Sequence, residues 1–246
     1  MEYERFLQQI RFHDMEPMTE HISVVFDVHS RETLRAAQKR FRAIDVHAVD
    51  LPEDQQAFEA MLKPALKVPR MSTFANGAII ARTVQEMAAG TSYVNVGIWN
   101  GFSFFAGMVA GPDRTVVGID NFSQFGGPKE QAMAVFERLK GPRHSFYDMD
   151  YRDYFSHVHE GEIGFYFYDG EHSYENQLQG LKVAEPYFSK DCIVLVDDTN
   201  WEEPRQATLD FVAQSASSYR MLFDEKTAWN GHPTYWNGLM LLRREG

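Results

Sequence analysis

The sequence predicts an α/β protein built on a doubly wound, mostly parallel sheet of seven strands, Rossmann-like, with an antiparallel pair at one edge. From about residue 71 onward, strand-like and helix-like segments alternate. The runs YVNVGI (93–98), IGFYFY (163–168) and CIVLV (192–196) are apolar on both faces, as parallel strands covered by helices on both sides are. The last two strand-like runs have no helix between them, which favours antiparallel pairing.

The predicted core domain, residues 71–246, is divided as follows. We expect strands at 93–98, 115–120, 144–150, 163–169 and 192–198, and then at about 219–224 and 235–243. We expect helices over FSFFAGMVA, PKEQAMAVFERLK, SYENQLQGLKVAEPYF and EPRQATLDFVAQSA. The second of these is amphipathic, because Ala132, Val135, Phe136 and Leu139 share one face.

Residues 1–70 have a different pattern, and we interpret them as a mainly helical extension that serves as an acceptor cap or an oligomer contact. Residues 21–30 resemble a strand or extended segment, and residues 54–69 a helix broken near Pro64. Residues 31–44 predict a basic helix with one apolar stripe, formed by Leu34, Ala37, Phe41 and Ile44. A basic helix in an acidic protein suits a self-contact, so we expect a homo-oligomer.

Composition narrows the possible partners. The 246 residues are 44% hydrophobic and carry 24 basic against 35 acidic side chains, a net charge of -11. This balance argues against nucleic acid and anionic membrane as partners. Cys192 is the single cysteine, so no disulfide forms within the chain, and we expect a cytoplasmic protein. The N-terminus is too charged for a secretory signal, and no apolar stretch is long enough to span a bilayer.

A glycine turn follows the first predicted strand of the core domain. Gly97 and Gly101 precede a helix that begins near Phe102, which lets backbone and helix N–H groups approach a ligand. Such glycines are also common in turns that bind nothing. Asp120 ends the second strand roughly 20 residues later, where related folds place a carboxylate on ribose hydroxyls. Asp120 also suits a turn or helix cap, but together with the glycines it indicates a nucleoside-containing ligand.

Four predicted strands end in acids at the edge where parallel sheets bind ligands: Asp120, Asp150, Asp169 and the pair Asp197–Asp198. Carboxylates gathered at one edge repel each other unless a cation joins them. Asp169, Asp197 and Asp198 therefore predict a divalent metal site, with Mg²⁺ preferred because all ligands are hard oxygens. The alternative is that these acids cap the following helix.

His172 lies three residues after Asp169. Its ordinary pKa is close to neutral pH, which suits a general base. The alternative is that His172 only supports its neighbours or caps the helix that follows.

Taken together, these motifs resemble the class I S-adenosylmethionine-dependent methyltransferases, and most closely the macrocin-type sugar O-methyltransferases and the cephalosporin-hydroxylase-like group. The likeness covers about residues 71–246. Its motifs are YVNVGIWNGFS, GIDNFSQFGGP, YDGEHSYENQLQGL and CIVLVDDT, in the family's order and at matching separations.

The resemblance implies a role for each motif. Gly97 and Gly101 would approach the methionine part of S-adenosylmethionine, with Ser103 nearby. Asp120 would bind the ribose, and Asp150 or Tyr151 would border the adenine. Asp169, Asp197 and Asp198 match the family's metal ligands. We also expect Asn95 among the cofactor-binding residues. It departs from the family pattern, which usually has Glu or Asp there: an amide can join a hydrogen-bond network but cannot offer a charge to the cofactor's ammonium group.

We therefore expect an S-adenosylmethionine-dependent O-methyltransferase that acts on a hydroxyl of a small molecule, a sugar or glycosylated natural product, with metal assistance. Asp169 or His172 would remove the proton. The alternative is a non-catalytic ligand- or partner-binding module, which Asn95 favours and the intact acid set opposes. A nicotinamide-dependent oxidoreductase is disfavoured because G-x-G-x-x-G is absent. Trp229, Tyr235 and Trp236 fit edge-strand packing and substrate contact equally well.

Overall fold

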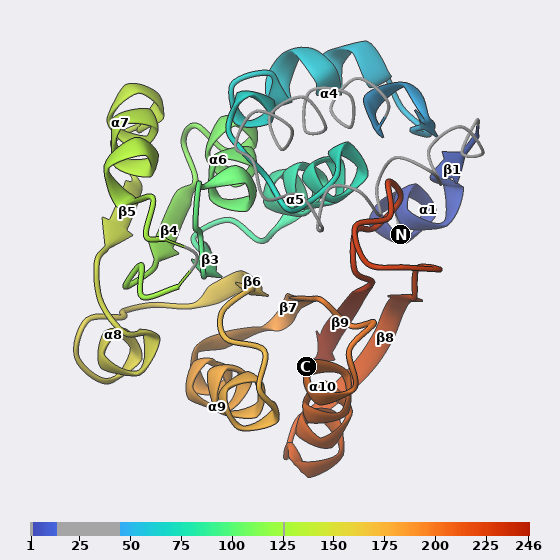
Figure 1. Ribbon diagram of the computed structural model, residues 1–246. Helices are drawn as coiled ribbons and strands as arrows, with labels where there is room; N and C mark the ends of the chain where they lie inside the picture. The colour runs from blue at the N-terminus through green and yellow to red at the C-terminus, as the bar shows by residue number, and fades with distance from the viewer. Residues whose placement is uncertain (1, 14–44, 125) are drawn as a thin grey trace.

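The protein is described here by a computed structural model that covers residues 2–13, 45–124 and 126–246. A seven-stranded sheet with the order β5-β4-β3-β6-β7-β9-β8 forms its centre (Figure 1). The strands are β3 (Ser92–Val96), β4 (Thr115–Ile119), β5 (His144–Tyr147), β6 (Ile163–Tyr168), β7 (Phe188–Asp197), β8 (Ser218–Glu225) and β9 (Leu239–Glu245). The first five are parallel to one another, and β9 lies antiparallel between β7 and β8. The predicted fold class is confirmed.

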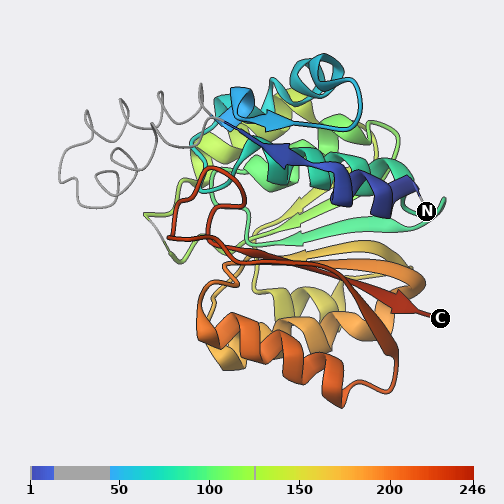
Figure 2. The ribbon, with the colours of Figure 1, turned by 90° about the vertical axis from the view of Figure 1, so that its right-hand side faces the viewer.

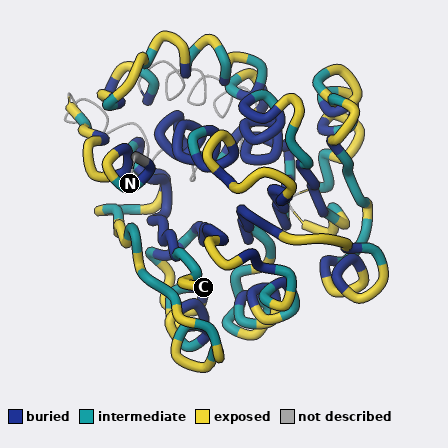
Figure 3. Tube along the Cα trace, turned by 180° about the vertical axis from the view of Figure 1, so that it is seen from behind, coloured by how far each residue is buried: buried dark blue, intermediate teal, exposed yellow. Residues whose placement is uncertain are grey.

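Helices cover both faces of the sheet, in two layers that Figure 2 shows edge-on. One layer contains α5 (Phe74–Glu86), α6 (Phe102–Ala110) and α7 (Lys129–Leu139), and the other contains α8 (Tyr151–His157), α9 (Tyr174–Ala184) and α10 (Glu202–Gln214). The central strands between them are buried, which explains why β3 and β6 are apolar on both faces (Figure 3). Among the described helices, none has both the length and the apolar character needed to cross a membrane.

The described N-terminal residues join the first helical layer. They form α1 (Glu2–Gln9), α4 (Gln55–Leu62), a 3₁₀ turn (Ala65–Lys67) and a two-stranded sheet of β1 (Arg11–Phe12) and β2 (Val49–Asp50). Phe6 and Leu62 belong to the same hydrophobic core as Ile79 and Phe104. The break predicted near Pro64 is confirmed, whereas the segments expected at 21–30 and 31–44 lie outside the described residues.

Several predicted boundaries differ from the structure. Helix α5 was not predicted as a separate element; ten of its thirteen residues are buried, so it has no polar face. The third predicted strand ends at Tyr147, because Asp150 caps α8. The last strand begins at Leu239, not near 235, because Trp236 and Gly238 have left-handed backbones, with φ of 59° and 88°. The fifth predicted strand begins earlier, at Phe188.

The topology places the site. Sequence order reverses between the neighbours β3 and β6, which makes the space beyond their carboxyl ends the switch point where open α/β sheets bind ligands. Because β4, β6 and β7 are parallel to β3, Asp120, Asp169 and Asp197 reach this same edge.

A buried ion pair anchors the start of α5. Asp45 is 1% exposed, and Nη2 of Arg70 donates to both of its carboxylate oxygens, at 2.7 and 2.8 Å. Asp45 also accepts a hydrogen bond from the N–H of Phe74, the first residue of α5, at 2.7 Å. Burial raises the pKa of Asp45 to about 6, against the opposing charge of Arg70.

Replacement of Arg70 by methionine is expected to lower the free energy of unfolding by about 3–5 kcal/mol, because it leaves a buried carboxylate without its cation. Urea denaturation measures this change. The double variant Asp45→Asn/Arg70→Met should recover much of the lost stability. A single variant within about 1 kcal/mol of the wild type would contradict this role.

Candidate active site

A cavity of about 1050 Å³ opens at the carboxyl ends of the parallel strands. Segments from both sides of the switch point line it. From the β3, β4 and β5 side come Gly97, Ile98, Trp99, Phe102, Ser103, Asp120, Phe122, Asp150 and Tyr151. From the β6, β7 and β9 side come Asp169, Glu171, His172, Asp197, Asp198, Trp201, Trp236 and Asn237. The structure thus brings the predicted site residues to one cavity, except Asn95 and Gly101, which are not part of its lining.

Unusual backbone conformations gather at this cavity. Among the described residues, four that are not glycine have a left-handed backbone, with φ between 45° and 59°: Trp99, Phe122, Asp198 and Trp236. All four line the cavity. Left-handed backbone is costly for residues with a side chain, and it clusters at functional sites where the surrounding structure enforces it. This independently indicates that the cavity is the functional site.

The glycine turn fits tightly against the end of β6. Gly97 has φ of 79°, and a Cβ atom on it would lie 1.9 Å from the carbonyl oxygen of Asp169. The N–H of Asp169 donates to the carbonyl oxygen of Val96 at 2.8 Å. Gly101, with φ of 94°, precedes α6 in a left-handed conformation. The glycines therefore let the turn pack directly on the strand end that carries Asp169, and Ser103 lies in the first turn of α6 at the cavity wall.

Asp120 holds the glycine turn in place. One carboxylate oxygen accepts from the N–H groups of Ile98 and Trp99, both at 2.8 Å, and the other accepts from Phe122 at 2.6 Å. Asp120 is therefore a turn acid, the alternative that its position allowed. A carboxylate has about four lone-pair sites, so it retains capacity for hydroxyl donors from the cavity. Its contact with a ribose stays a prediction.

Asn95 lies behind the glycine turn. It is fully buried, and its side-chain Nδ2 donates to the carbonyl oxygen of Gly97 at 3.1 Å. Its Oδ1 accepts from the hydroxyl of Tyr93 at 3.3 Å. Because a carboxylate could not donate to that carbonyl, the amide suits this position better than the family's usual acid. The expectation that Asn95 reaches the cofactor is not supported, since it is not among the residues that line the cavity.

Asp150 and Tyr151 lie where the third parallel strand gives way to α8. Asp150 caps α8 and forms an ion pair with Arg152, whose hydrogen bonds hold the pKa of Asp150 below its ordinary value. Tyr151 is buried, and its hydroxyl donates to Asn176 at 3.4 Å. Both side chains line the cavity, so their contact with an adenine ring stays a prediction.

His172 lies between two carboxylates on the other side of the cavity. Its Nε2 lies 3.5 Å from Oδ1 of Asp169 and 3.2 Å from Oδ2 of Asp198. Burial lowers the pKa of His172, but the hydrogen bond to Asp169 and the charges of Asp198 and Asp169 outweigh it, so the net shift is upward. The pair of carboxylates therefore stabilises a protonated imidazole.

The three acids are not equivalent. Burial raises the pKa of Asp169 to about 6, while His172 opposes the shift. Burial also raises the pKa of Asp198, against the charge of His172 and a hydrogen bond from Asn237. Asp197 is 3% exposed, and burial together with its two acidic neighbours raises its pKa well above the ordinary value. Its Oδ1 accepts from the N–H of Asp198 at 2.9 Å, so Asp197 serves mainly as an internal partner.

The predicted metal ligands do not converge as a set. Within the described part of the chain, no group of three or more His, Cys, Asp and Glu side chains is arranged to hold a metal ion. The imidazole of His172 lies between Asp169 and Asp198 and supplies the positive charge that their mutual repulsion calls for. The residues therefore fit a cationic imidazole better than a three-carboxylate cage, and the divalent metal stays a prediction.

Two site residues were missed from the sequence. Trp201 is 43% exposed and presents its ring to His172 in an edge-to-face arrangement, with centroids 5.8 Å apart. Its place three residues after Asp198 was the available signal. Asn237 donates to Asp198 at 2.6 Å, yet it is 39 residues away along the chain, so no local pattern marks it.

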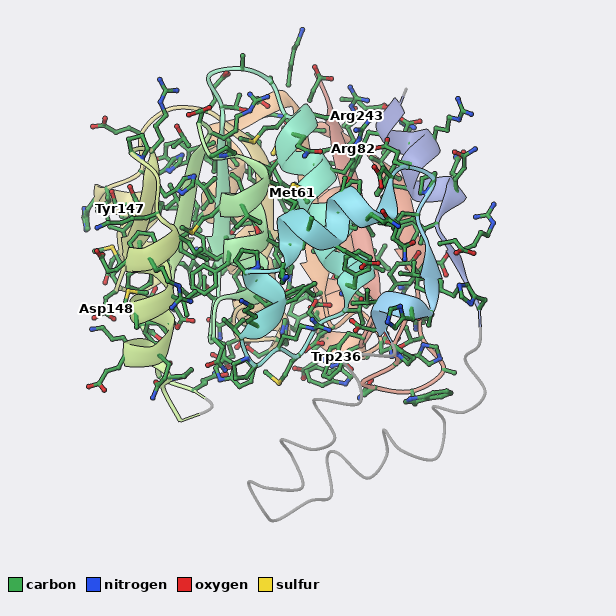
Figure 4. All side chains as sticks on the ribbon, turned by 90° about the horizontal axis from the view of Figure 1, so that it is seen from above. Met61, Arg82, Tyr147, Asp148, Trp236 and Arg243 are labelled. Carbon is green, nitrogen blue, oxygen red and sulfur yellow. The ribbon has the colours of Figure 1, made fainter. Side chains whose placement is uncertain are left out.

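The structure gives different surroundings to Trp229, Tyr235 and Trp236, for which the sequence allowed both edge-strand packing and substrate contact. Trp236 lines the cavity, and Figure 4 labels it in the loop before β9. Tyr235 instead packs edge-on against Phe12 and Phe223. The ring of Trp229 lies 4.2 Å from that of His232, measured between centroids.

Comparison with known proteins shows what part of the chain resembles. The family model of a methyltransferase domain matches residues 94–199, which run from β3 past the end of β7. Comparison with curated sequences gave no significant match. The motif resemblance to class I S-adenosylmethionine-dependent methyltransferases is confirmed by this match, and the solved structures described next share the fold.

Three of these structures have TM-scores of 0.56 and 14% identity to this chain. An O-methyltransferase from Bacillus cereus, in complex with SAH, aligns over 79% of this chain and 92% of its own. TomG, an O-methyltransferase from Streptomyces achromogenes solved in complex with SAM, aligns over 85% and 99%. PaMTH1, an SAH-bound methyltransferase from Podospora anserina, aligns over 89% and 98%. At these identities the likeness concerns the fold.

Proposed function

We propose that this protein is an S-adenosylmethionine-dependent O-methyltransferase that acts on a hydroxyl group of a small molecule. One observation carries the proposal: a single cavity joins the glycine turn and Asp120 to the cluster of His172, Asp169 and Asp198. The first group suits a nucleoside cofactor and the second suits removal of a proton. The SAM- and SAH-bound structures with the same fold support this assignment.

The cofactor would lie on the β3 and β4 side. The glycine turn exposes backbone there, and Asp120 offers acceptor sites for hydroxyls. S-adenosylmethionine carries a sulfonium cation, which the acidic cavity attracts, and when bound it supplies an electrophilic methyl group. The chain's own contribution is to align the acceptor oxygen for in-line attack and to exclude water.

His172 is the general base in this proposal. The neutral imidazole would take the proton of the acceptor hydroxyl as the oxygen attacks. Asp169 and Asp198, at 3.5 and 3.2 Å, would then stabilise the imidazolium that forms. The ring of Trp201 lies edge-to-face with the same imidazole.

The charges of the cavity favour an uncharged or cationic acceptor. Its described acidic residues are Asp120, Asp150, Asp169, Glu171, Asp197, Asp198 and Glu203. Its two described arginines, Arg70 and Arg152, are each already paired with an acid. A phosphate or carboxylate acceptor would meet repulsion, whereas a sugar or glycosylated natural product offers neutral hydroxyls, and Trp201 and Trp236 offer apolar ring faces. The acidic composition argues against nucleic acid and anionic membrane as partners, the single cysteine suits the cytoplasm, and the basic helix predicted at 31–44 suits a homo-oligomer.

Calorimetric titration with S-adenosylmethionine, S-adenosylhomocysteine and NAD is the first test. We expect both adenosyl compounds to bind and NAD not to bind. Release of S-adenosylhomocysteine is then measured with a panel of sugar and phenolic acceptors. Cofactor binding without turnover across a broad panel would favour the non-catalytic module, and NAD binding would overturn the proposal.

Replacement of Asp120 by asparagine tests the cofactor side. The variant keeps an acceptor oxygen but loses the charge, and the affinity for S-adenosylmethionine should fall by about 1.5–3 kcal/mol, the value of a hydrogen bond to a charged group. Calorimetry measures the affinity, and circular dichroism checks that the turn has not unfolded. Unchanged affinity would exclude a ribose contact for Asp120.

The divalent metal is the remaining part of the proposal. The described acids do not converge as a metal cage; if Mg²⁺ is nevertheless required, Asp169, Asp197 and Asp198 are the oxygens that would hold it. Chelation should then abolish turnover, Mg²⁺ should restore it, and the metal should bind more weakly as pH falls. Full turnover in excess chelator, with no metal found by elemental analysis, would assign the chemistry to His172 and the two acids alone.

A further inference from the structure

We propose that Asn237 is a positioning residue that orients Asp198 toward His172. It thereby links the β8–β9 loop to the cluster of His172, Asp169 and Asp198. The inference deepens the proposed function and rests on it for its catalytic consequence. Asn237 lies in the loop between β8 and β9 and is 7% exposed at the cavity wall.

Both ends of the Asn237 side chain are used. Its Nδ2 donates to Oδ1 of Asp198 at 2.6 Å, and its Oδ1 accepts from the N–H of Gly231 at 2.7 Å. The other oxygen of Asp198, Oδ2, faces Nε2 of His172 at 3.2 Å. The amide therefore holds one carboxylate oxygen so that the second one points at the imidazole.

The backbone around Asn237 is built to deliver this contact. Asn237 lies between Trp236 and Gly238, which both have a left-handed backbone, with φ of 59° and 88°. The carbonyl oxygen of Asn237 accepts from the N–H of Asn200 at 2.7 Å, and the hydroxyl of Thr227 donates to the carbonyl oxygen of Trp236 at 2.9 Å. A strained segment held at both sides of one side chain is the arrangement expected for a fixed orientation.

The loop also forms part of the acceptor wall. Asn230, Trp236 and Asn237 all line the cavity, and Asn230 is tied to the same Asn200 by a hydrogen bond of 3.2 Å. A molecule that contacts the loop therefore contacts the segment that sets the orientation of Asp198. Proper placement of the base would depend on loop residues far from β6 and β7 in sequence.

Two variants test the Nδ2 donor of Asn237 separately from its Oδ1 acceptor. Asn237→Asp keeps an acceptor for Gly231 but loses the N–H that Asp198 receives, and Asn237→Leu loses both. The matched control is Asn200→Ala, which loosens the same loop through Thr227 and Asn230 but whose side chain does not contact Asp198. Crystal structures of all three with S-adenosylhomocysteine show the separation between Asp198 and His172, and calorimetry gives the S-adenosylhomocysteine affinity.

We expect both Asn237 variants to lose the contact between Asp198 and His172 while binding S-adenosylhomocysteine within about threefold of the wild type. With an acceptor that the wild type methylates, their turnover number should fall about 10- to 100-fold with little change in KM. Asn200→Ala should keep the contact and mainly raise KM. If Asn237→Asp keeps the contact, or if Asn200→Ala lowers the turnover number equally, the positioning role is wrong. If the wild type binds no adenosyl compound and methylates nothing, the proposed function fails, while the crystal structures still decide whether Asn237 orients Asp198.

Discussion

Replacement of Asp169 by asparagine is expected to lower the turnover number of methyl transfer by about 10²- to 10⁴-fold, the range for general-base catalysis by His172, which Asp169 supports. Asp169 lies 3.5 Å from His172, and its charge helps to stabilise the imidazolium that proton removal creates. An asparagine fills the same space without that charge. Release of S-adenosylhomocysteine measures turnover, and calorimetry should show cofactor affinity within about threefold of the wild type. Glu171→Gln, on the same loop, is the matched control and should remain active.

The pH dependence distinguishes the two candidate bases. The pKa of His172 is raised above its ordinary value of 6.5, so its neutral form increases as pH rises, and turnover should increase along one limb above that pH. His172→Ala should remove the limb and most of the turnover. The raised pKa of His172 also increases the free energy of unfolding, because the folded state favours the protonated imidazole. This contribution is present in full below about pH 6.5 and is lost as pH rises through the shifted pKa. If His172→Ala retains the limb and much of the turnover, Asp169 is the base.

Replacement of Gly97 by alanine is expected to lower the free energy of unfolding by about 3 kcal/mol and to abolish turnover. The backbone of Gly97 is left-handed, with φ of 79°, and a Cβ atom would lie 1.9 Å from the carbonyl oxygen of Asp169. A left-handed alanine alone costs about 1–2 kcal/mol, and the clash adds to it because backbone must move. The same movement separates the glycine turn from Asp169. Urea denaturation and S-adenosylhomocysteine release measure the two effects.

Gly90→Ala is the matched control for this variant. Gly90 has a similar φ of 85°, but a Cβ atom on it would have no heavy atom within 4 Å. It should therefore lose only the backbone cost of about 1–2 kcal/mol and keep its turnover. Equal destabilisation of the two variants would show that the turn does not pack on the end of β6 as described.

Much of the fold could be predicted from the sequence because its signals are local. The apolar residues of β3 and β6 appear as unbroken runs since both faces of these strands are buried. Gly97 marks the turn after β3, and Asp120 and Asp169 mark the ends of β4 and β6. These roles can be predicted because each depends on the type of residue at the position itself. The family motifs extended these signals to a resemblance to class I methyltransferases, and the model of a methyltransferase domain matches residues 94–199.

What the tertiary structure alone decided depends on contacts between distant segments. Helix α5 has no amphipathic pattern, because neighbours cover it on almost every side. Asn95 belongs to the motif but donates inward to Gly97, which follows from how the turn closes and not from its spacing. Asn237 meets Asp198 only because β9 returns antiparallel beside β7 and the backbone turns left-handed at Trp236. The charge that joins Asp169 and Asp198 was predicted to be a metal ion, whereas the fold of the β6 loop places the imidazole of His172 between them.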